Sequence, residues 1–328
     1  MSVPLETLAR EVVAWMKAES AETQAEIYLS HDEDRLLSRR GGERDSVEAS
    51  ETAGAAVRVV RDGRVGFASA GGADLPGIRD LYARALEQLP FAEPDRRREL
   101  PGPRAFAADA GLAASLWDES LFTASWPSIE RKMVAAESAA RAEAGAAKVI
   151  RAEYAERRSA LVVAGTGGLF ASERGGSADF SIVVAAESGP DTQLGEGLRI
   201  ERFAAALDCV AAGREAGRRA KSLLGAKRAM EGRRSVLFEP WVGGEFLELI
   251  SELLSADEAQ GGRSLLAGKI GRTVASSLVT LRDDPRRRGG LGSRQVDDEG
   301  LLTRDKAMIE EGILKERSEE RRVGKECA

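Results

Sequence analysis

The strongest local constraint on the fold is an Asp-Gly step between two β-rich runs. Residues 57–69 read VRVVRDGRVGFAS, with Asp62-Gly63 near the centre. Asp-Gly supplies the positive φ angles that a two-residue hairpin turn requires, and the flanking valines favour extended backbone. The sequence therefore predicts a hairpin here and antiparallel strands in the first part of the chain.

Alternating and β-rich runs indicate further strands. We expect a strand at residues 25–30, a hairpin over 34–48 around two glycines, and a β meander over 148–187. The glycine cluster at 165–168 lies inside the meander and is expected to be a turn rather than a phosphate-binding loop, because no GxxxxGK[ST] pattern is present.

Helical spacing of apolar residues predicts four amphipathic helices. Asp74, just before Pro76, is expected to cap one of them. Cys209 falls on the apolar side of the helix predicted at 199–224 and is expected to be a small core residue. Its neighbours Phe203, Leu207 and Val210 are expected to be buried with it. The four helices are expected at residues 3–18, 76–89, 127–146 and 199–224.

The length of 328 residues suggests two domains at roughly 150 residues each. The pattern changes near residue 230, where a short strand at 235–240 and a helix at 242–255 precede a glycine-rich, strand-like stretch. We predict an α+β fold. Residues 1–230 would form an α/β domain with an antiparallel or mixed sheet and flanking helices, and residues 231–316 would begin a mostly antiparallel β domain.

The composition excludes several functional classes. The chain has one histidine, His31, so no two-histidine zinc or catalytic site can form, and His31 itself is expected to be a lone exposed side chain. Two cysteines are too few for a disulfide framework. A net charge of −6 disfavours direct nucleic-acid binding, and no apolar run reaches the ~18 residues of a membrane span. We therefore expect a cytoplasmic protein.

Acidic clusters are the only candidate metal-binding groups. Glu245, Glu248 and Glu252 share one face of the helix predicted at 242–255, and two acidic groups follow at 283–284 and 297–299. Such carboxylates could bind a divalent ion. The interpretation we favour is a solvated helix face and Asp-containing turns between strands.

Several segments in a fixed order resemble the TldD/PmbA family. These are SLLAGKIG, TLRDDP, VDDEG and IEEGIL, preceded by the hairpin and helix of residues 57–89. The likeness covers about residues 20–315. The family also carries the label of modulator of DNA gyrase and contains peptidases.

The resemblance implies a division of labour between two chain types. TldD-type chains carry an HExxxH zinc motif and act as metallopeptidases on unfolded or small peptides, whereas PmbA-type chains (TldE) lack the motif and pair with TldD. With Gly243 set on the family glycine, Leu247 and Glu252 fall on the two histidine positions and Glu248 on the glutamate. A glutamate acts as general base here only if a metal positions its water, and Leu247 offers no donor atom.

The chain therefore resembles the non-catalytic, PmbA-type subunit of a cytosolic TldD/TldE-type metallopeptidase complex. It would be inactive alone, would hold no cofactor, and would form a heterodimer with a TldD-like chain that holds the zinc. Peptides would be the substrates, and neither nucleic acid nor membrane would be a direct partner. The remaining family-pattern positions are expected to be structural: Gly243, Asp283, Asp284, Pro285, Asp298, Glu299 and Gly300.

Two alternatives stay open. One is a hydrolase acting alone, with a divalent ion held by carboxylates among Asp283, Asp284, Asp297, Asp298 and Glu299. The other is a purely structural or binding module. Metal content and peptidase activity of the isolated chain separate these from the partner-subunit hypothesis.

The end of the sequence departs from the family pattern. After about Lys315 the chain reads without strand alternation, and residues 317–328 are expected to be an aberrant or disordered tail. On this interpretation the second domain is truncated, and its strands would present open edges that favour aggregation.

Overall fold

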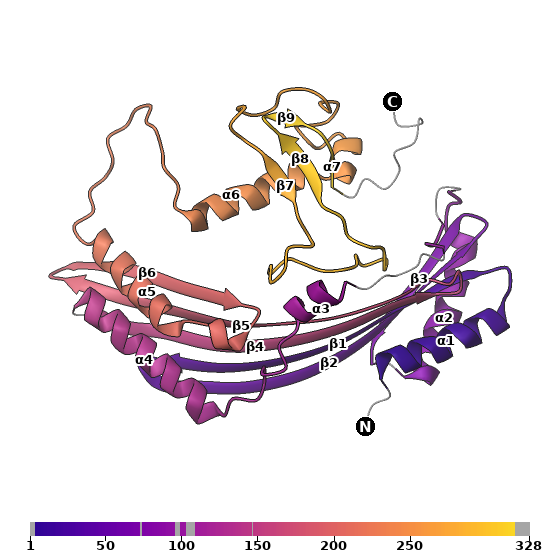
Figure 1. Cartoon of the computed structure of the whole chain (residues 1–328), viewed down its shortest axis with the longest axis horizontal. Helices are drawn as coiled ribbons and strands as arrows, with labels where there is room; N and C mark the ends of the chain where they lie inside the picture. Colours follow the sequence, from indigo (N-terminus) through magenta and orange to yellow (C-terminus); the bar gives the residue numbers. More distant parts are fainter. Residues whose placement is uncertain (1–3, 73, 96–98, 103–108, 146, 319–328) are drawn as a thin grey trace. The chain divides into compact units, whose positions relative to one another are not determined.

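The computed structural model describes residues 4–72, 74–95, 99–102, 109–145 and 147–318. The chain divides into two compact units (Figure 1). Unit 1 comprises residues 1–226 and 286–303, and unit 2 comprises residues 227–285 and 304–328. The tail expected from residue 317 onward lies outside the described residues except for its first two positions.

Unit 1 is built on one antiparallel sheet of six strands in the order β3-β2-β1-β4-β5-β6. Sequence neighbours pair as hairpins, and β1 joins the two groups of three strands by pairing with β4. The expected α+β class with antiparallel strands is confirmed. The strands are β1 (Gln24–Arg40), β2 (Glu43–Arg61), β3 (Arg64–Gly71), β4 (Ala147–Gly165), β5 (Phe170–Ser188) and β6 (Asp191–Glu201).

The hairpin predictions are confirmed at both turns. Asp62 and Gly63 have φ angles of 51° and 71°, and Gly41 and Gly42 also have positive φ. The meander expected over 148–187 is instead a single hairpin of two 19-residue strands, β4 and β5. The glycines of β5 do not interrupt the strand. Gly176 lies within it, at a position where a Cβ would crowd Leu121 and the carbonyl of Arg157, so glycine is there for close packing and not as a turn.

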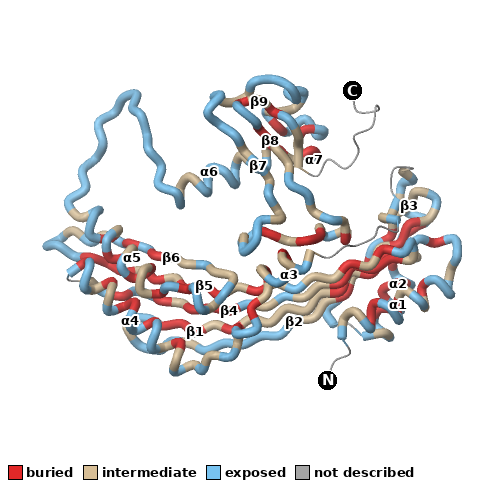
Figure 2. The backbone as a smooth tube through the Cα atoms, viewed as in Figure 1, coloured by how far each residue is buried: buried red, intermediate tan, exposed pale blue. Residues whose placement is uncertain are grey.

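Two helix pairs cover opposite ends of the long strands on unit 1 (Figure 1). α1 (Leu5–Glu19) and α2 (Leu75–Gln88) pack on one end, and α4 (Trp126–Ala144) and α5 (Cys209–Leu223) on the other. The middle of β1, from Ser30 to Asp34, is polar and only partly buried, so the two ends of β1 contribute to two separate cores (Figure 2). The two ends of β4 do the same. The shorter helical segments of unit 1 are η1 (Leu89–Phe91), α3 (Ala110–Leu116) and η2 (Ala204–Ala206).

Three of the four predicted helices form close to their expected limits. Asp74 caps α2 by accepting a hydrogen bond from the Gly77 amide at 2.8 Å. The inward residues predicted for α4 are all buried: Ile129, Met133, Ala136 and Ala140.

The helix predicted over 199–224 is wrong in its first ten residues. Residues up to Glu201 belong to β6, and α5 starts at Cys209 after Asp208, whose carboxylate caps the amide of Ala211 at 2.8 Å. Strand pairing with β5 therefore overrides the helical spacing. Phe203 is consequently exposed, whereas Cys209 is buried as expected, and burial raises the pKa of its thiol to about 11.

Glycine lets α5 approach its neighbours at backbone distance. A Cβ on Gly213 would overlap the carbonyl oxygen of Ala136 on α4, and one on Gly217 would overlap that of Ala140. On the sheet side, Gly195 and Gly197 of β6 lie equally close to the α5 backbone. This layer therefore packs without large side chains between its elements, which matches an aromatic content of only 5%.

Buried ion pairs fix the loop before α4 to the sheet. Arg35 of β1 donates through Nε to Glu156 of β4 at 2.9 Å and through Nη1 to the carbonyl of Ala124 at 2.9 Å. Glu156 is fully buried and also accepts from the Tyr154 hydroxyl at 2.7 Å and from the amide of Phe122. Burial and this bond to Glu156 raise the pKa of Tyr154 well above its usual value.

The described residues of unit 2 form two helices and a small antiparallel sheet. These are α6 (Pro240–Leu253), α7 (Ala256–Gln260), β7 (Leu281–Asp283), β8 (Lys306–Glu310) and β9 (Ile313–Leu314), with the strand order β7-β8-β9. Leu254, Met308, Ile309 and Leu314 form its core. The strand expected at 235–240 is absent: these residues are exposed, and within the described part of unit 2 no strand pairs with them.

We expect Gly213→Ala to lower the free energy of unfolding by about 1–3 kcal/mol, because its methyl group overlaps the α4 backbone. Urea unfolding followed by circular dichroism measures the change. Gly71→Ala is the matched control, since a Cβ there meets nothing within 4 Å. Equal stability of the two variants would contradict the close-packing explanation.

Arg35→Met should destabilise the protein by about 3–5 kcal/mol, since it leaves the buried Glu156 carboxylate without its cation. Lys148→Met removes one partner of an exposed pair, Lys148 with Glu187, and should have a much smaller effect. The double variant Arg35→Met/Glu156→Gln should recover part of the loss, measured by the same urea titration. No recovery would mean that the packing of Arg35, not its charge, matters.

Candidate functional site

Helix α6 carries Gly243, Leu247, Glu248 and Glu252, the positions that we set against the family zinc motif in the sequence. Pro240 occupies its first turn, where a missing amide hydrogen costs nothing. Leu247, Glu248 and Glu252 are all exposed, and no side chain of α6 is fully buried. A Cβ on Gly243 would meet nothing within 4 Å, so nothing within the described chain requires glycine there for space.

The donor set on α6 does not fit a zinc ion. Leu247 has no donor atom, and Glu248 and Glu252 offer only carboxylate oxygens on a solvated helix. In the regions that the structure describes, no three His, Cys, Asp or Glu side chains are grouped to hold a metal ion.

His31, the single histidine of the chain, lies on β1 in unit 1. Its Nε2 is 2.8 Å from a carboxylate oxygen of Glu51 on the neighbouring strand β2. The ring is partly exposed, at 31%. A surface pair of this kind accounts for His31 without a ligand or a nucleophile.

The acidic pair in unit 2 lies at the end of a strand. Asp283 is the last residue of β7 and is 3.3 Å from the ammonium of Lys306 on β8. Asp284 and Pro285 follow directly, at the point where the chain leaves unit 2. This position lets Asp283 pair across the strands, and proline ends the sheet pairing because it lacks an amide hydrogen.

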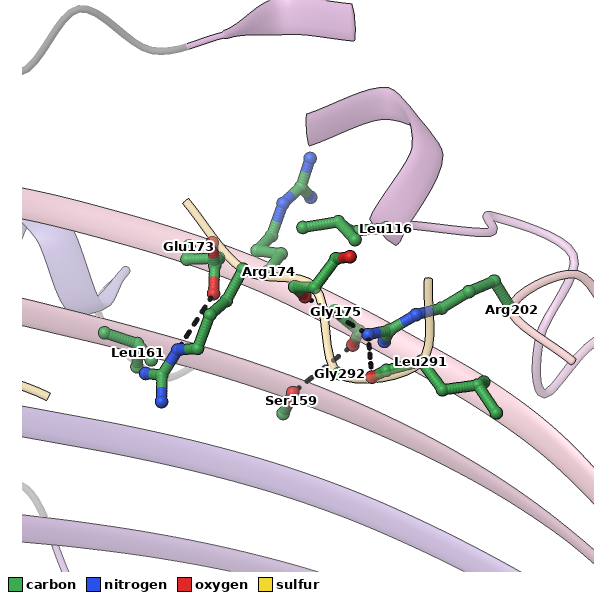
Figure 3. Close-up of a pocket in the computed structure, with 11 residues that line it drawn as sticks. Leu116, Ser159, Leu161, Glu173, Arg174, Gly175, Arg202, Leu291 and Gly292 are labelled. Atoms are coloured by element: carbon green, nitrogen blue, oxygen red, sulfur yellow. Dashed lines mark hydrogen bonds and ion pairs between the residues drawn. The ribbon is translucent and has the colours of Figure 1, made fainter. Parts of the chain in front are cut away.

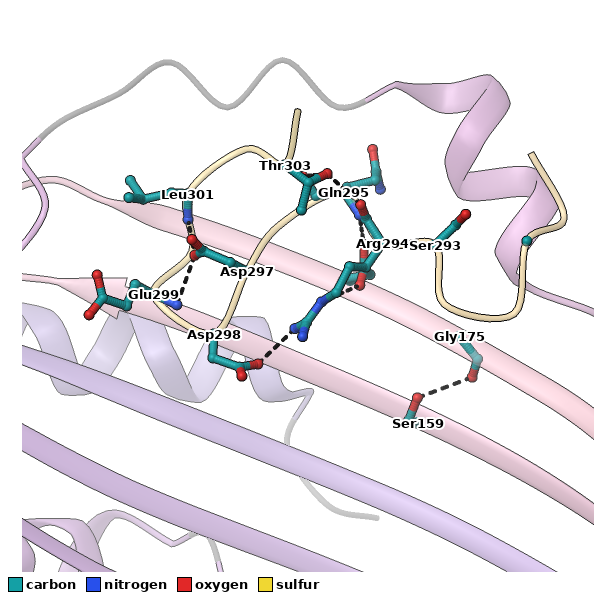
Figure 4. A network of polar contacts seen from close by, with 12 residues as sticks. Ser159, Gly175, Ser293, Arg294, Gln295, Asp297, Asp298, Glu299, Leu301 and Thr303 are labelled. Atoms are coloured by element: carbon teal, nitrogen blue, oxygen red, sulfur yellow. Dashed lines mark hydrogen bonds and ion pairs between the residues drawn. The ribbon is translucent and has the colours of Figure 1, made fainter. Parts of the chain in front are cut away.

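Residues 286–303, which we call the strap, belong to unit 1 and contain the VDDEG segment (Figure 4). Asp297 accepts hydrogen bonds from the amides of Glu299 and Leu301, both at 2.9 Å. Gly300 has a φ of 72° and donates its amide to the Asp297 carbonyl at 3.0 Å. The segment is thus a tight turn that Asp297 organises and Gly300 permits.

The other acidic residues of the strap are held by arginines. Asp298 is 2.8 Å from Arg294, and Glu299 is 3.0 Å from Arg58 on β2. Arg58 also pairs with Glu26 at 2.9 Å. Because each carboxylate has a cationic or backbone partner, the structure brings these acidic residues together as a structural network rather than as an open ligand set.

Arg202 and Glu173 seat the strap and were not among the residues that the sequence singled out. Arg202 donates to the strap carbonyls of Gly290, at 3.1 and 3.2 Å, and Ser293, at 3.3 Å, and also to that of Leu291. Glu173 of β5 accepts from the amide of Gln295. Burial raises the pKa of Glu173 and lowers that of Arg202. No sequence signal links residues this far apart along the chain.

Three family models match most of the chain. They are described as PmbA/TldA metallopeptidase domain 1, over residues 25–89, the central domain, over 125–224, and the C-terminal domain, over 231–327. The chain belongs to the PmbA/TldD family. The matched ranges contain the sheet of unit 1 except the first residue of β1, the α4–α5 layer, and helix α6.

Curated members of the family match over a shorter stretch. The metalloprotease MJ0996 of Methanocaldococcus jannaschii is 37% identical over 102 residues, 31% of this chain and 23% of that protein. In Buchnera aphidicola of Acyrthosiphon pisum, the TldD homologue is 37% identical over 103 residues and the PmbA homologue 26% over 102, each 31% of this chain, and 21% and 23% of those proteins. The chain thus matches about a quarter of the length of these relatives.

Solved structures share the fold over nearly the whole chain. TldE from Thermococcus kodakarensis superposes with a TM-score of 0.80 at 21% identity, over 94% of this chain and 69% of that one. A Thermotoga maritima protein named as a modulator of a DNA gyrase (TM0727) gives 0.82 at 20% identity, over 95% and 70%. At these identities the likeness shows the fold alone.

We expect Glu173→Gln to change how stability depends on pH. A carboxyl whose pKa is raised by burial destabilises the fold when ionised, and this cost disappears as pH falls through the raised pKa. The wild type should therefore gain stability relative to Glu173→Gln between neutral pH and the ordinary glutamate pKa of about 4.3. Urea unfolding at a series of pH values measures the difference.

The same substitution at an exposed position of β5, Glu187→Gln, gives the background for this measurement. If the difference in the free energy of unfolding between wild type and Glu173→Gln does not vary with pH, burial of the ionised Glu173 carboxylate does not destabilise the fold.

Proposed function

We propose that this chain is a non-catalytic, PmbA-type subunit of a cytosolic metallopeptidase complex. In this proposal it pairs with a TldD-like chain, which holds the zinc, and the complex cleaves unfolded or small peptides. One observation carries the proposal: α6 presents Leu247, a side chain without a donor atom, at the position set against the first zinc-binding histidine of the family motif.

Exposed apolar residues on α6 support a role in assembly. Phe246, Leu247 and Leu249 are 46–59% exposed, and the ring centre of Phe246 lies 4.6 Å from that of Phe238, in the segment that precedes the helix, with the ring planes tilted by 47°. Apolar side chains gathered in this way are typical of surfaces that contact another protein. No helix among the described residues is long and apolar enough to cross a membrane.

The assignment to the PmbA type depends on the motif residues and not on overall identity. The matched stretch is in fact more similar to the TldD homologue of Buchnera aphidicola, at 37%, than to the PmbA homologue, at 26%. Glu252 could ligate a metal, but it would be a single ligand on α6. The proposal of a PmbA type therefore rests on the missing donor atom at Leu247, against the higher overall identity to the TldD homologue.

The experiment is co-expression of the chain with a TldD-like chain from the same cell. We expect the two to co-purify, zinc to follow the partner in elemental analysis, and peptidase activity to require the partner. The isolated chain should contain no stoichiometric metal and should hydrolyse no peptide. The partner alone is the control that shows how much activity this chain adds.

Two results would contradict the proposal. One is failure to co-purify together with partner activity that this chain does not change. The other is hydrolysis by the isolated, metal-containing chain that is lost in Asp298→Ala, which would instead support a carboxylate-bound divalent ion.

A further inference from the structure

Strand β2 extends well past the end of its neighbour β3. β3 pairs with β2 from Gly54 to Arg61, whereas β1 pairs with it from Glu43 to Val60. Residues 47–52, which we call the β2 edge, are all exposed. Among the described residues, no strand or loop pairs with the backbone of the β2 edge on the side away from β1. An edge of this kind is a template on which an extended peptide can pair.

Ala53 shows which backbone groups point away from β1. Its carbonyl accepts from the amide of Gly72 at 2.8 Å, just beyond the end of β3. Because backbone groups alternate sides along an antiparallel strand, Val47, Ala49 and Glu51 direct their amides and carbonyls to the same side as Ala53. No hydrogen bond from another described residue occupies these groups. They therefore offer both donors and acceptors to an added strand.

The face of the sheet that bears the strap is acidic beside the β2 edge. Glu48 makes no ion pair with a described residue. Arg157 of β4 is shared between Asp34 of β1, at 3.4 Å, and Asp179 of β5, at 3.1 Å. Burial and the nearby carboxylate of Asp34 raise the pKa of Asp32. One guanidinium thus lies among four carboxylates, and the group keeps a net negative charge.

A cleft of about 540 Å³ lies on this acidic face, next to the β2 edge. Its lining residues include Glu48 and Ser50 of β2, Asp34 of β1 and Arg157 of β4. The strap lies over the adjoining part of the same face, where Ser159 lines a separate cleft (Figure 3). Because neighbouring strands are about 4.8 Å apart, a lysine or arginine on an added strand can lie across Ser50 and reach Asp34.

The opposite face of the β2 edge is more apolar. Val47 is 42% exposed, and Ala49 follows on the same face. The carboxylate of Glu51 on this face is already bonded to His31. Since side chains alternate between the faces of a strand, a peptide whose basic residues meet Glu48 presents the residues between them to Val47 and Ala49. The complementary peptide therefore alternates basic and apolar residues.

The charges of β2 disfavour a second copy of this chain as the occupant. Residues 43–53 carry four carboxylates and one guanidinium: Glu43, Asp45, Glu48, Glu51 and Arg44. Two such strands side by side would bring like charges together, which destabilises a cross-strand pair. A basic segment has the complementary charge.

We propose that the β2 edge binds an extended, basic segment of another polypeptide, which adds a strand to the sheet of unit 1. Backbone hydrogen bonds to Val47, Ala49 and Glu51 hold the segment. Its lysine or arginine side chains contact Glu48 and Asp34, and its apolar side chains contact Val47. This inference goes beyond the proposed function, because neither zinc nor a TldD-like chain takes part in it.

The test measures binding of fluorescein-labelled peptides to the full chain, without a partner, by fluorescence anisotropy at low salt. The basic probe is a heptapeptide that alternates lysine and valine between threonine ends. The acidic probe has glutamate in place of lysine, and the third probe is the basic peptide N-methylated at every residue, which keeps the charge but removes the amide donors. We expect the basic probe to bind about tenfold more tightly than either of the others, and added salt to weaken it.

Two variants locate the site. Ala49→Pro should weaken binding of the basic probe about tenfold, because it removes an amide that faces the added strand and none that faces β1. Glu48→Gln should weaken it about two- to fivefold, as expected for one cross-strand charge pair. Glu196→Gln is the matched control and should bind like the wild type, since Glu196 is an exposed glutamate on β6 at the opposite edge of the sheet.

Urea unfolding shows whether each variant is folded. If Ala49→Pro does not fold, Glu48→Gln and the N-methylated probe still decide between strand pairing and charge attraction alone.

Equal binding of the basic and N-methylated probes would overturn the proposal, as would equal binding of the basic and acidic probes. Unchanged affinity in folded Ala49→Pro and Glu48→Gln would also overturn it, because the peptide would then bind elsewhere. Self-association of the chain that Ala49→Pro abolishes would show that a second copy is the occupant instead. The titration needs no TldD-like chain, so its failure is distinct from a failure to co-purify.

Discussion

The backbone contact of α5 with α4 and β6 is the constraint on which one end of unit 1 depends. Glycines 195, 197, 213 and 217 stand where any side chain would overlap a neighbouring backbone carbonyl. The layer therefore reaches core density with alanine and glycine, and β6 can act as a well-covered edge of the sheet. The buried Arg35–Glu156 pair then fixes the loop before α4 to the same end of the sheet.

The strap shows how the acidic residues of a family motif serve structure in this chain. Asp297 organises a turn, Asp298 and Glu299 pair with arginines, and Gly300 fits against Leu169 and Val163. These contacts position a segment that forms one wall of a cleft whose other walls include Ser159, Leu161 and Glu173. The exposed positions of α6 and the charge pairing in the strap are thus separate features of the molecule.

Local signals were enough to predict much of the fold. Asp62-Gly63 determines a hairpin by its own φ preferences, and Asp74 with Pro76 begins α2. The spacing of apolar residues failed to predict two segments. Residues 199–201 pair with β5 instead of extending α5. Residues 235–240 find no strand to pair with among the described residues. The candidate site was predicted in part, because α6 was located but Glu173 and Arg202 were not.

The sequence by itself determined what chemistry is unavailable: one histidine and a leucine at residue 247 rule out a two-histidine zinc site, whatever the fold. Only the tertiary structure decided which charges remain free. Arg58, Arg202 and Arg294 have hydrogen-bond partners that lie 4 to 241 residues away along the chain, whereas Arg174 has none among the described residues. Pairing depends on distance in space, and the sheet sets that distance by bringing β2, β5 and the strap together.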